Sequence, residues 1–157
     1  MKHFLTSFLF VVISLFGISG CATIKMGGVV VSVADIKPAD PSPQGMMATL
    51  TIDYANENVV SIGISQGIHK LYLNDTYVGS SVNVDPIGLP QMATSKQSVP
   101  FHIEKADYVR KLAAGASNHA VPYRIVTHLR SYSGEDKVEF NTANTGMIDL
   151  SPLVSAK

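Results

Sequence analysis

The chain has 157 residues, a length that suits one domain together with a targeting segment. It carries 12 basic and 12 acidic residues, and removal of Lys2 with the first twenty residues leaves 11 against 12, a net charge of −1. This balance excludes the basic surface that nucleic-acid binding requires, and it excludes attachment to anionic lipid by charge alone. The single cysteine, Cys21, rules out an internal disulfide.

Residues 1–20 have the pattern of a bacterial signal peptide. Lys2 gives a basic start, and residues 4–16 are apolar except for one threonine and two serines. An apolar stretch of about 7–15 residues is typical of signal peptides, whereas a membrane-spanning helix needs about 20 residues. We therefore expect residues 1–20 to be a targeting segment.

Cys21 ends the run Ile18-Ser19-Gly20-Cys21. This run resembles the lipobox of bacterial lipoproteins, in which an aliphatic residue and two small residues precede a cysteine that receives diacylglycerol on its sulfur. The resemblance implies cleavage before Cys21, lipid on Cys21 and a short linker through residue 28, with several acyl chains giving stable membrane attachment. The alternatives are an ordinary cleaved signal peptide with an incidental cysteine, or an uncleaved anchor helix.

The residue after the cysteine bears on localisation. Lipoproteins of Gram-negative bacteria that have Asp at this position are commonly kept in the inner membrane, and this chain has Ala22. The resemblance therefore implies a lipid-anchored protein of the cell envelope. In a Gram-negative host it would lie in the outer membrane and face the periplasm.

From Val29 onward, apolar and polar residues alternate with the period of β-strands. The strongest pattern runs from Met46 to Tyr54, with the even-numbered residues predicted to be buried. Further strands are predicted at 29–37, 70–74, 77–82, 97–104 and 123–130, with shorter ones around 138–140 and over 147–150. Pro100 cannot donate to a strand ladder, so the strand that contains it is predicted to lie at an edge or to be bulged there.

The predicted strands are separated by recognisable connections. Asn74-Asp75-Thr76 is typical of a hairpin turn, and residues 85–92 are predicted to be a loop. Residues 106–114 place Val109, Leu112 and Ala113 at helical spacing. About seven strands and one short helix predict an all-β domain over 29–151, built as a two-sheet sandwich and followed by a tail at 152–157.

Several short patterns occur in a characteristic order along this domain. They are Val33-Ala34-Asp35-Ile36-Lys37-Pro38, Asn56-Glu57-Asn58, Leu71-Tyr72-Leu73-Asn74, Val78-Gly79, Val99-Pro100-Phe101, Lys111-Leu112 and Tyr123-Arg124-Ile125. Their order resembles the late-embryogenesis-abundant group 2 domain, also called the water-stress and hypersensitive-response (WHy) domain, over roughly residues 30–150. The resemblance implies a fibronectin- or immunoglobulin-like β-sandwich, found in desiccation-related proteins, with no known catalytic centre. Glu57 departs from the family pattern, which usually has proline between the two asparagines.

The sequence contains no pattern typical of an active site or a metal centre. His69, His102, His119 and His128 are widely spaced and lack clustered Cys or carboxylate partners, so we interpret them as surface residues. Cross-strand adjacency of His102 and His128 is the alternative. The nucleophile motif Gly-x-Ser-x-Gly is also missing. We therefore predict no enzymatic activity, no metal, no cofactor and no small-molecule substrate.

Arg124, His128 and Arg130 share the outward face of one predicted strand. A solvated sheet face is the simplest interpretation, and a weak strip for an anion or a protein partner is the sharper hypothesis. The first functional hypothesis is a non-catalytic lipoprotein of the WHy type, anchored through Cys21, that protects or binds envelope components under water stress. The alternative is an accessory envelope lipoprotein whose domain docks onto a partner protein, for example through the edge of the Pro100 strand.

Overall fold

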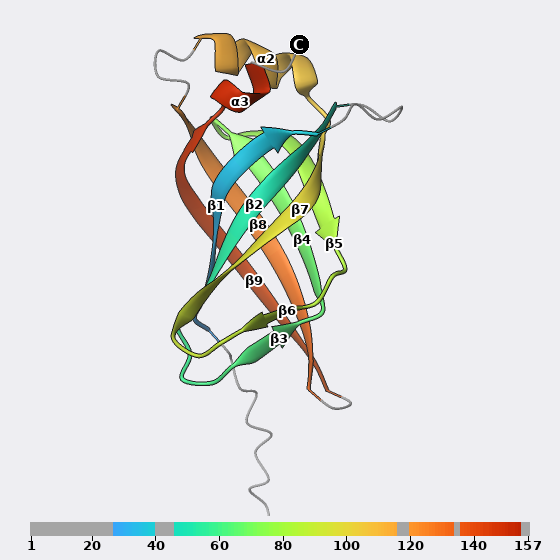
Figure 1. Cartoon of the computed structure of the whole chain (residues 1–157), viewed down its shortest axis with the longest axis vertical. Coiled ribbons are helices and arrows are strands. Elements are labelled where there is room, and N and C mark those ends of the chain that lie inside the picture. Colours follow the sequence, from blue (N-terminus) through green and yellow to red (C-terminus); the bar gives the residue numbers. More distant parts are fainter. Residues whose placement is uncertain (1–26, 40–45, 116–119, 134–135, 155–157) are drawn as a thin grey trace, which may run out of the picture.

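The computed structural model describes residues 27–39, 46–115, 120–133 and 136–154. The expected signal peptide, Cys21 and His119 lie outside these ranges. Figure 1 shows an elongated domain of long strands with two helices at one end. The strands are β1 (Val29–Pro38), β2 (Met46–Asn56), β3 (Ile62–Ile64), β4 (Gln66–Leu73), β5 (Thr76–Asn83), β6 (Ile87–Leu89), β7 (Ala93–Ile103), β8 (Ala120–Ser133) and β9 (Asp136–Asp149), and the helices are α2 (Ala106–Gly115) and α3 (Ser151–Val154).

Seven strands form one antiparallel sheet in the order β1-β2-β7-β5-β4-β8-β9, while β3 and β6 pair separately. The large sheet curls until β1 and β9, its first and last strands, pack against each other (Figure 1). Strands β5 and β7 pair only at Gly79–Ile103 and Ser80–His102. The all-β prediction is confirmed. Hydrogen bonds join these seven strands into one sheet. The predicted division into two packed sheets is therefore not confirmed.

The core follows the alternation that the sequence predicts. On β2, Ala48, Leu50, Ile52 and Tyr54 are buried, and the intervening residues are half-buried. The inward residues of β1, β7 and β8 pack against this face across the inside of the curled sheet. Complete burial of one such side chain contributes about 1.5–3 kcal/mol, so these strands supply most of the hydrophobic stabilisation.

Pro100 lies on an inner strand, not on an edge strand. Strand β7 pairs with β2 along its whole length, including Thr49 with Pro100. On its other side the ladder to β5 stops after His102, and the carbonyl of Pro100 instead accepts a hydrogen bond from the Ser81 hydroxyl at 2.6 Å. In an antiparallel sheet, the backbone nitrogen and the carbonyl oxygen of one residue point toward the same neighbouring strand. Pro100 therefore meets β5 where the ladder has ended, which is how an inner strand accommodates proline.

Other connections refine the sequence predictions. The hairpin between β4 and β5 is confirmed, and Asn74 and Asp75 have φ of 46° and 60°, a left-handed conformation that Asn and Asp tolerate. The predicted loop at 85–92 contains the short strand β6. Helix α2 is confirmed, with Val109 and Ala113 buried. The helices cover one end of the domain, and the β3–β6 sheet lies at the other end, called the basal end below (Figure 1).

Candidate functional site

The predicted strip lies on β8, and all three of its side chains contact described neighbours. The Nε atom of Arg130 lies 3.3 Å from the Glu139 carboxylate, and its Nη1 donates to Gln66 at 2.8 Å. The Nδ1 atom of His128 lies 2.8 Å from Oδ1 of Asn141. Because hydrogen bonds and ion pairs hold both side chains, they face solvent as a neutralised surface. A binding role for the strip stays a prediction.

Glu139 is the acidic centre of this surface. It contacts Lys137 as well as Arg130 and His128. The hydrogen bond from Lys137, with smaller contributions from His128 and Arg130, lowers the pKa of Glu139 below its ordinary value. These contacts therefore stabilise the ionised carboxylate of Glu139 over its protonated form.

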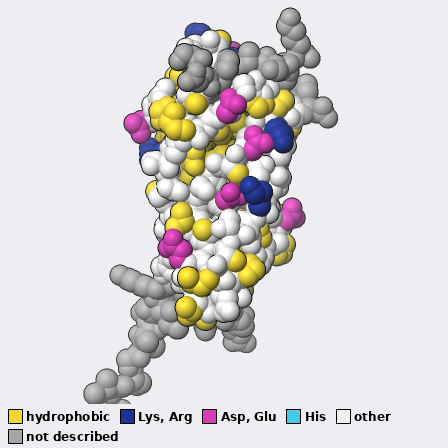
Figure 2. Space-filling view, turned by 60° about the vertical axis from the view of Figure 1, so that its left-hand side comes forward, with side chains coloured by type: hydrophobic (Ala, Val, Ile, Leu, Met, Phe, Trp, Pro, Cys, Tyr) yellow, Lys and Arg dark blue, Asp and Glu magenta, His cyan; other side chains and the backbone are white. Residues whose placement is uncertain are grey.

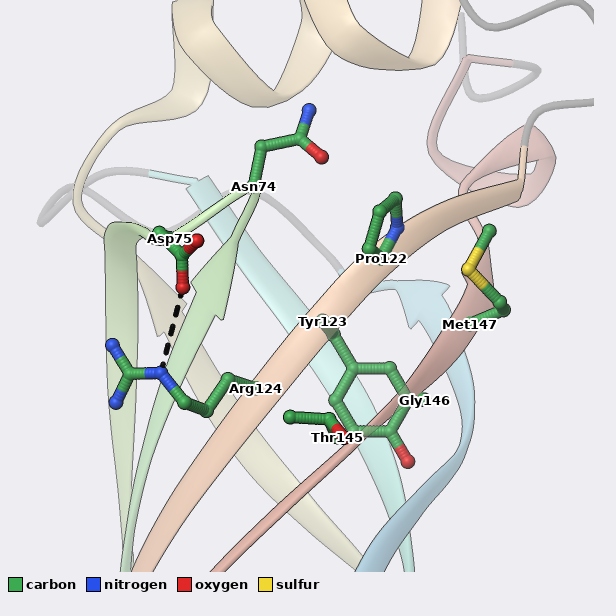
Figure 3. A pocket seen from close by; sticks show the side chains of 8 residues that line it. All are labelled: Asn74, Asp75, Pro122, Tyr123, Arg124, Thr145, Gly146 and Met147. Atoms are coloured by element: carbon green, nitrogen blue, oxygen red, sulfur yellow. Dashed lines mark ion pairs between the residues drawn. The ribbon is translucent and has the colours of Figure 1, made fainter.

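Arg124 lies apart from the other two strip residues, beside the β4–β5 turn. Its guanidinium carbon lies 3.9 Å from the centroid of the Tyr72 ring, and its Nε lies 3.7 Å from Asp75. Arg124 and Asp75 both line an open hollow of about 570 Å³. Figure 3 shows their ion pair beside the other lining side chains. The hollow is lined by Asn74, Asp75, Pro122, Tyr123, Arg124, Thr145, Gly146 and Met147. The only charges among these residues are one ion pair, so the hollow has no net charge to select a ligand.

The histidine predictions need two corrections. His69 is fully buried, because it lies on the inward face of β4 with Leu71 and Leu73. The period-two alternation along 67–73 was the signal that could have found it. His102 and His128 are not adjacent, because β5 and β4 separate their strands in the sheet.

His69 joins strands from opposite sides of the interior. Its Nε2 lies 3.1 Å from the Tyr54 hydroxyl on β2, and its Nδ1 lies 3.0 Å from the Thr127 hydroxyl on β8. Burial lowers the pKa of His69 to about 4 and raises the pKa of Tyr54. At neutral pH both groups are therefore uncharged, and the hydroxyls satisfy both ring nitrogens of the imidazole.

The Asn56-Glu57-Asn58 segment fastens the basal end. The buried amide nitrogen of Asn56 lies 2.9 Å from the carbonyl oxygen of Val60 and 3.0 Å from those of Leu89 and Pro90. Its oxygen accepts from the backbone N–H of Asn58 at 3.0 Å. Both asparagine side chains therefore bond to nearby backbone, and the turn forms with Glu57 in the place of the usual proline.

The same segment ties the loops to the start of β1. The backbone N–H of Glu57 donates to the Gly28 carbonyl at 2.7 Å, and the Asn58 side chain reaches the same oxygen at 3.3 Å. The Met92 N–H donates to the Asn58 carbonyl at 3.1 Å. The loops after β2 and after β6 are thus held against the point where the chain enters β1.

A family model supplies the identification. The family described as "Late embryogenesis abundant protein" (LEA_2) matches residues 51–142, from β2 into β9 and more than half of the chain. The chain belongs to this family. LEA_2 membership places it among water-stress-related proteins, a family whose members are generally non-enzymatic.

Solved structures show the same fold. The solution structure of a protein from Arabidopsis thaliana aligns with a TM-score of 0.55 at 15% identity, covering 83% of this chain and 89% of that one. The solution structure of a putative late embryogenesis abundant (LEA) protein aligns with a TM-score of 0.53 at 19% identity, covering 98% and 88%. No curated protein matches the sequence of this chain.

The described residues offer neither a membrane-spanning helix nor a metal cluster. None of the helices in that part of the chain is long and apolar enough to cross a membrane. The same residues contain no group of three or more His, Cys, Asp or Glu side chains that could hold a metal ion.

Proposed function

We propose that this LEA_2 protein is a lipid-anchored, non-catalytic protein of the cell envelope that protects or binds envelope components during water stress. The family match over residues 51–142 carries the water-stress part of the proposal. The lipobox-like run ending at Cys21, directly after an apolar segment of signal-peptide length, supports the anchor. The domain acts as a folded unit, since it buries a continuous apolar core and lacks the high charge of disordered desiccation proteins.

Protection by a folded domain comes from its surface. On the outer faces of the strands, five cations each have an acidic partner within 4.0 Å, namely Lys37, Lys96, Arg124, Arg130 and Lys137. Such a surface offers balanced charge and no strong field toward one class of ligand. We infer that the protein acts near the membrane through its position there, and that Cys21 provides this position.

Survival after drying tests the proposal. A deletion strain is dried and rewetted while carrying the intact gene, the Cys21→Ala gene or an empty vector. We expect the intact gene to restore survival and Cys21→Ala to fail, with immunoblots of envelope fractions confirming that the variant is exported. If deletion leaves survival unchanged, the stress role is wrong.

Labelling with an alkyne-bearing fatty acid tests the anchor separately. We expect label on the intact protein and none on Cys21→Ala. The accessory-subunit alternative predicts a different result, namely one partner protein that is crosslinked to the domain and co-purifies in a fixed ratio. A general protectant should instead shield unrelated enzymes or vesicles during drying without such a partner.

A further inference from the structure

Exposed apolar side chains gather at the basal end of the domain. Val59 is 78% exposed, Val60 50% and Met92 69%, and these three residues are called the basal patch. Tyr132, 58% exposed, lies near the end of β8 at the same end of the molecule (Figure 1). On the face shown in Figure 2, several hydrophobic side chains lie at the lower end, as others do at the upper end, and the Lys and Arg side chains lie higher up.

The hydrogen bonds around Asn56 and Asn58 hold the basal patch together. The Val60 carbonyl accepts from the Asn56 side chain, and the Met92 N–H donates to the Asn58 carbonyl. Met92 also has a φ of 50°, a left-handed conformation that bulky residues rarely adopt. The fold thus places a large apolar side chain in solvent at a position where glycine or asparagine would be easier to accommodate.

A short tether joins this end to Cys21. Gly28 accepts hydrogen bonds from Glu57 and Asn58 beside the patch. Cys21 precedes Gly27 by six residues, and a fully extended chain spans at most about 3.3–3.6 Å per residue. A lipid on Cys21 would therefore keep Gly27 within about 20 Å of its attachment point.

Local charge indicates which surface the basal patch can contact. The segments 56–69 and 83–95, which form the β3–β6 sheet and its loops, contain no Lys or Arg, and their acidic residues are Glu57 and Asp85. Arg130 and Lys137 lie toward the same end as Tyr132, but both contact the Glu139 carboxylate. Attraction to anionic headgroups is therefore weak at this end, whereas burial of apolar side chains can hold it on a membrane. A hollow of about 330 Å³ lined by Ile62, Gly63, Gly88 and Leu89, with Ser61 and Pro90, continues the apolar surface.

We propose that the basal patch of Val59, Val60 and Met92 contacts the lipid bilayer, so that the domain stands on the membrane with α2 and α3 pointing away from it. This orientation rests on the proposed anchor at Cys21. The lipid supplies most of the binding free energy, and the patch fixes which end of the domain faces the bilayer.

The absence of tryptophan from the chain allows a direct test. Val59→Trp places the probe in the basal patch, and Met147→Trp places it at a residue that is 61% exposed near the opposite end. Each lipid-bearing variant, processed to begin at Cys21, is reconstituted into phosphatidylcholine vesicles with and without brominated acyl chains. Interfacial side chains lie about 5–10 Å into the headgroup boundary, so we expect at least about twofold quenching of Val59→Trp and none of Met147→Trp. Met92→Trp, on the other loop of the patch, repeats the test.

Vesicle flotation separates the orientation from the anchor. If the protein floats with the vesicles but Val59→Trp and Met92→Trp are quenched no more than Met147→Trp, the orientation is wrong and the anchor stands. Equal quenching at both ends means that the domain lies on its side, which also overturns the orientation. Failure of the intact protein to float overturns the anchor, and the orientation with it.

Discussion

At the scale of single residues, His69 has the least ordinary environment in the described domain. Its ring lies edge-on to Tyr54, with 5.9 Å between the ring centroids, and hydroxyl groups from two other strands reach its nitrogens. A Cβ added at Gly67 would lie 2.7 Å from the His69 Nε2, so glycine at 67 leaves room for the ring. Protonation would place a charge in this apolar interior, which desolvation opposes.

The first prediction follows from this burial. The pKa of His69 is about 4 in the folded protein and the ordinary value is 6.5, so between these pH values the unfolded chain binds more protons. The free energy of unfolding should therefore fall as the pH drops from about 6.5 to 4, by about 3 kcal/mol in total from this group. Urea unfolding at several pH values measures the fall, and the imidazole NMR resonances of His69 should titrate near pH 4.

His69→Gln provides the comparison for this prediction. Glutamine keeps hydrogen-bonding capacity but does not titrate in this range. The variant should be less stable at pH 7 and should lose the His69 share of the pH dependence. An identical pH dependence in both proteins, or a His69 resonance that titrates near 6.5, would show that the ring is not buried as described.

At the scale of elements, two junctions let one sheet curl on itself. At the first, Gly79 brings β5 against β7 before Pro100 ends their ladder. At the second, β1 and β9 are the two end strands of the sheet order, and the Tyr123 hydroxyl of β8 accepts a hydrogen bond from the Val33 N–H on β1 at 3.0 Å. Gly146 on β9 faces the Tyr123 ring, and an added Cβ there would lie 2.8 Å from it. A side chain therefore bridges the gap that a strand ladder would otherwise close.

Gly79→Ala tests the first junction. A Cβ at residue 79 would lie 2.1 Å from the carbonyl oxygen of His102, so the backbone of β5 or β7 must move. Overpacking of this kind costs about 1–3 kcal/mol, and we expect a loss of at least that size in the free energy of unfolding. Gly63→Ala is the matched control, because nothing lies within 4 Å of its added Cβ. Equal stability of the two variants in denaturant unfolding would contradict the close β5–β7 approach.

Tyr123→Phe tests the second junction. The variant keeps the ring but leaves the buried Val33 N–H without the hydroxyl partner, which costs about 1–3 kcal/mol. Hydrogen exchange at the Val33 amide should accelerate, and thermal unfolding should begin at a lower temperature. Tyr132→Phe, at a tyrosine that is largely exposed, should change neither measurement. Unaltered exchange at Val33 would show that Tyr123 does not bridge the gap.

At the scale of the whole molecule, charge balance limits what the domain can recognise. The sequence has equal numbers of acidic and basic residues, and the Arg130–Glu139 and Lys96–Asp53 pairs show cations meeting acids on the surface. Salt screens such pairs and would weaken any attachment that relied on charge. Lipid attachment depends on buried CH₂ groups and does not weaken in this way.

Membrane extraction tests this difference. We expect 1 M NaCl to leave the intact protein in the membrane fraction, because at about 1 M the Debye length is near 3 Å and only charge-based attachment is lost. Mild detergent should release it. The Cys21→Ala form, if it associates with membranes at all, should be removed by a wash without detergent. Release of the intact protein by salt alone would contradict the lipid anchor.

The sequence by itself determined the local features of this protein. Alternation along Met46–Tyr54 and along 123–130 decided which side chains face the core, since a strand has a period of two whichever strand lies beside it. Asn74-Asp75 decided the hairpin, and the spacing of Val109 and Ala113 decided the helix, because each depends on neighbours in the chain. The order of short patterns also led to the family that the match over 51–142 confirms.

Only the tertiary structure decided which strands are neighbours. The sequence predicts an edge or a bulge at Pro100, and its place on an inner strand follows only from the departure of β5 from β7 at that point. His69, interpreted from the sequence as a surface residue, lies on the inward face that the alternation along 67–73 marks, and only the structure shows the hydroxyl groups that other strands bring to its ring. The gathering of Val59, Val60 and Met92 beside Gly28 likewise depends on hydrogen bonds between residues some thirty positions apart. Pairings at such separations depend on the packing of the whole sheet, which no local pattern in the sequence encodes.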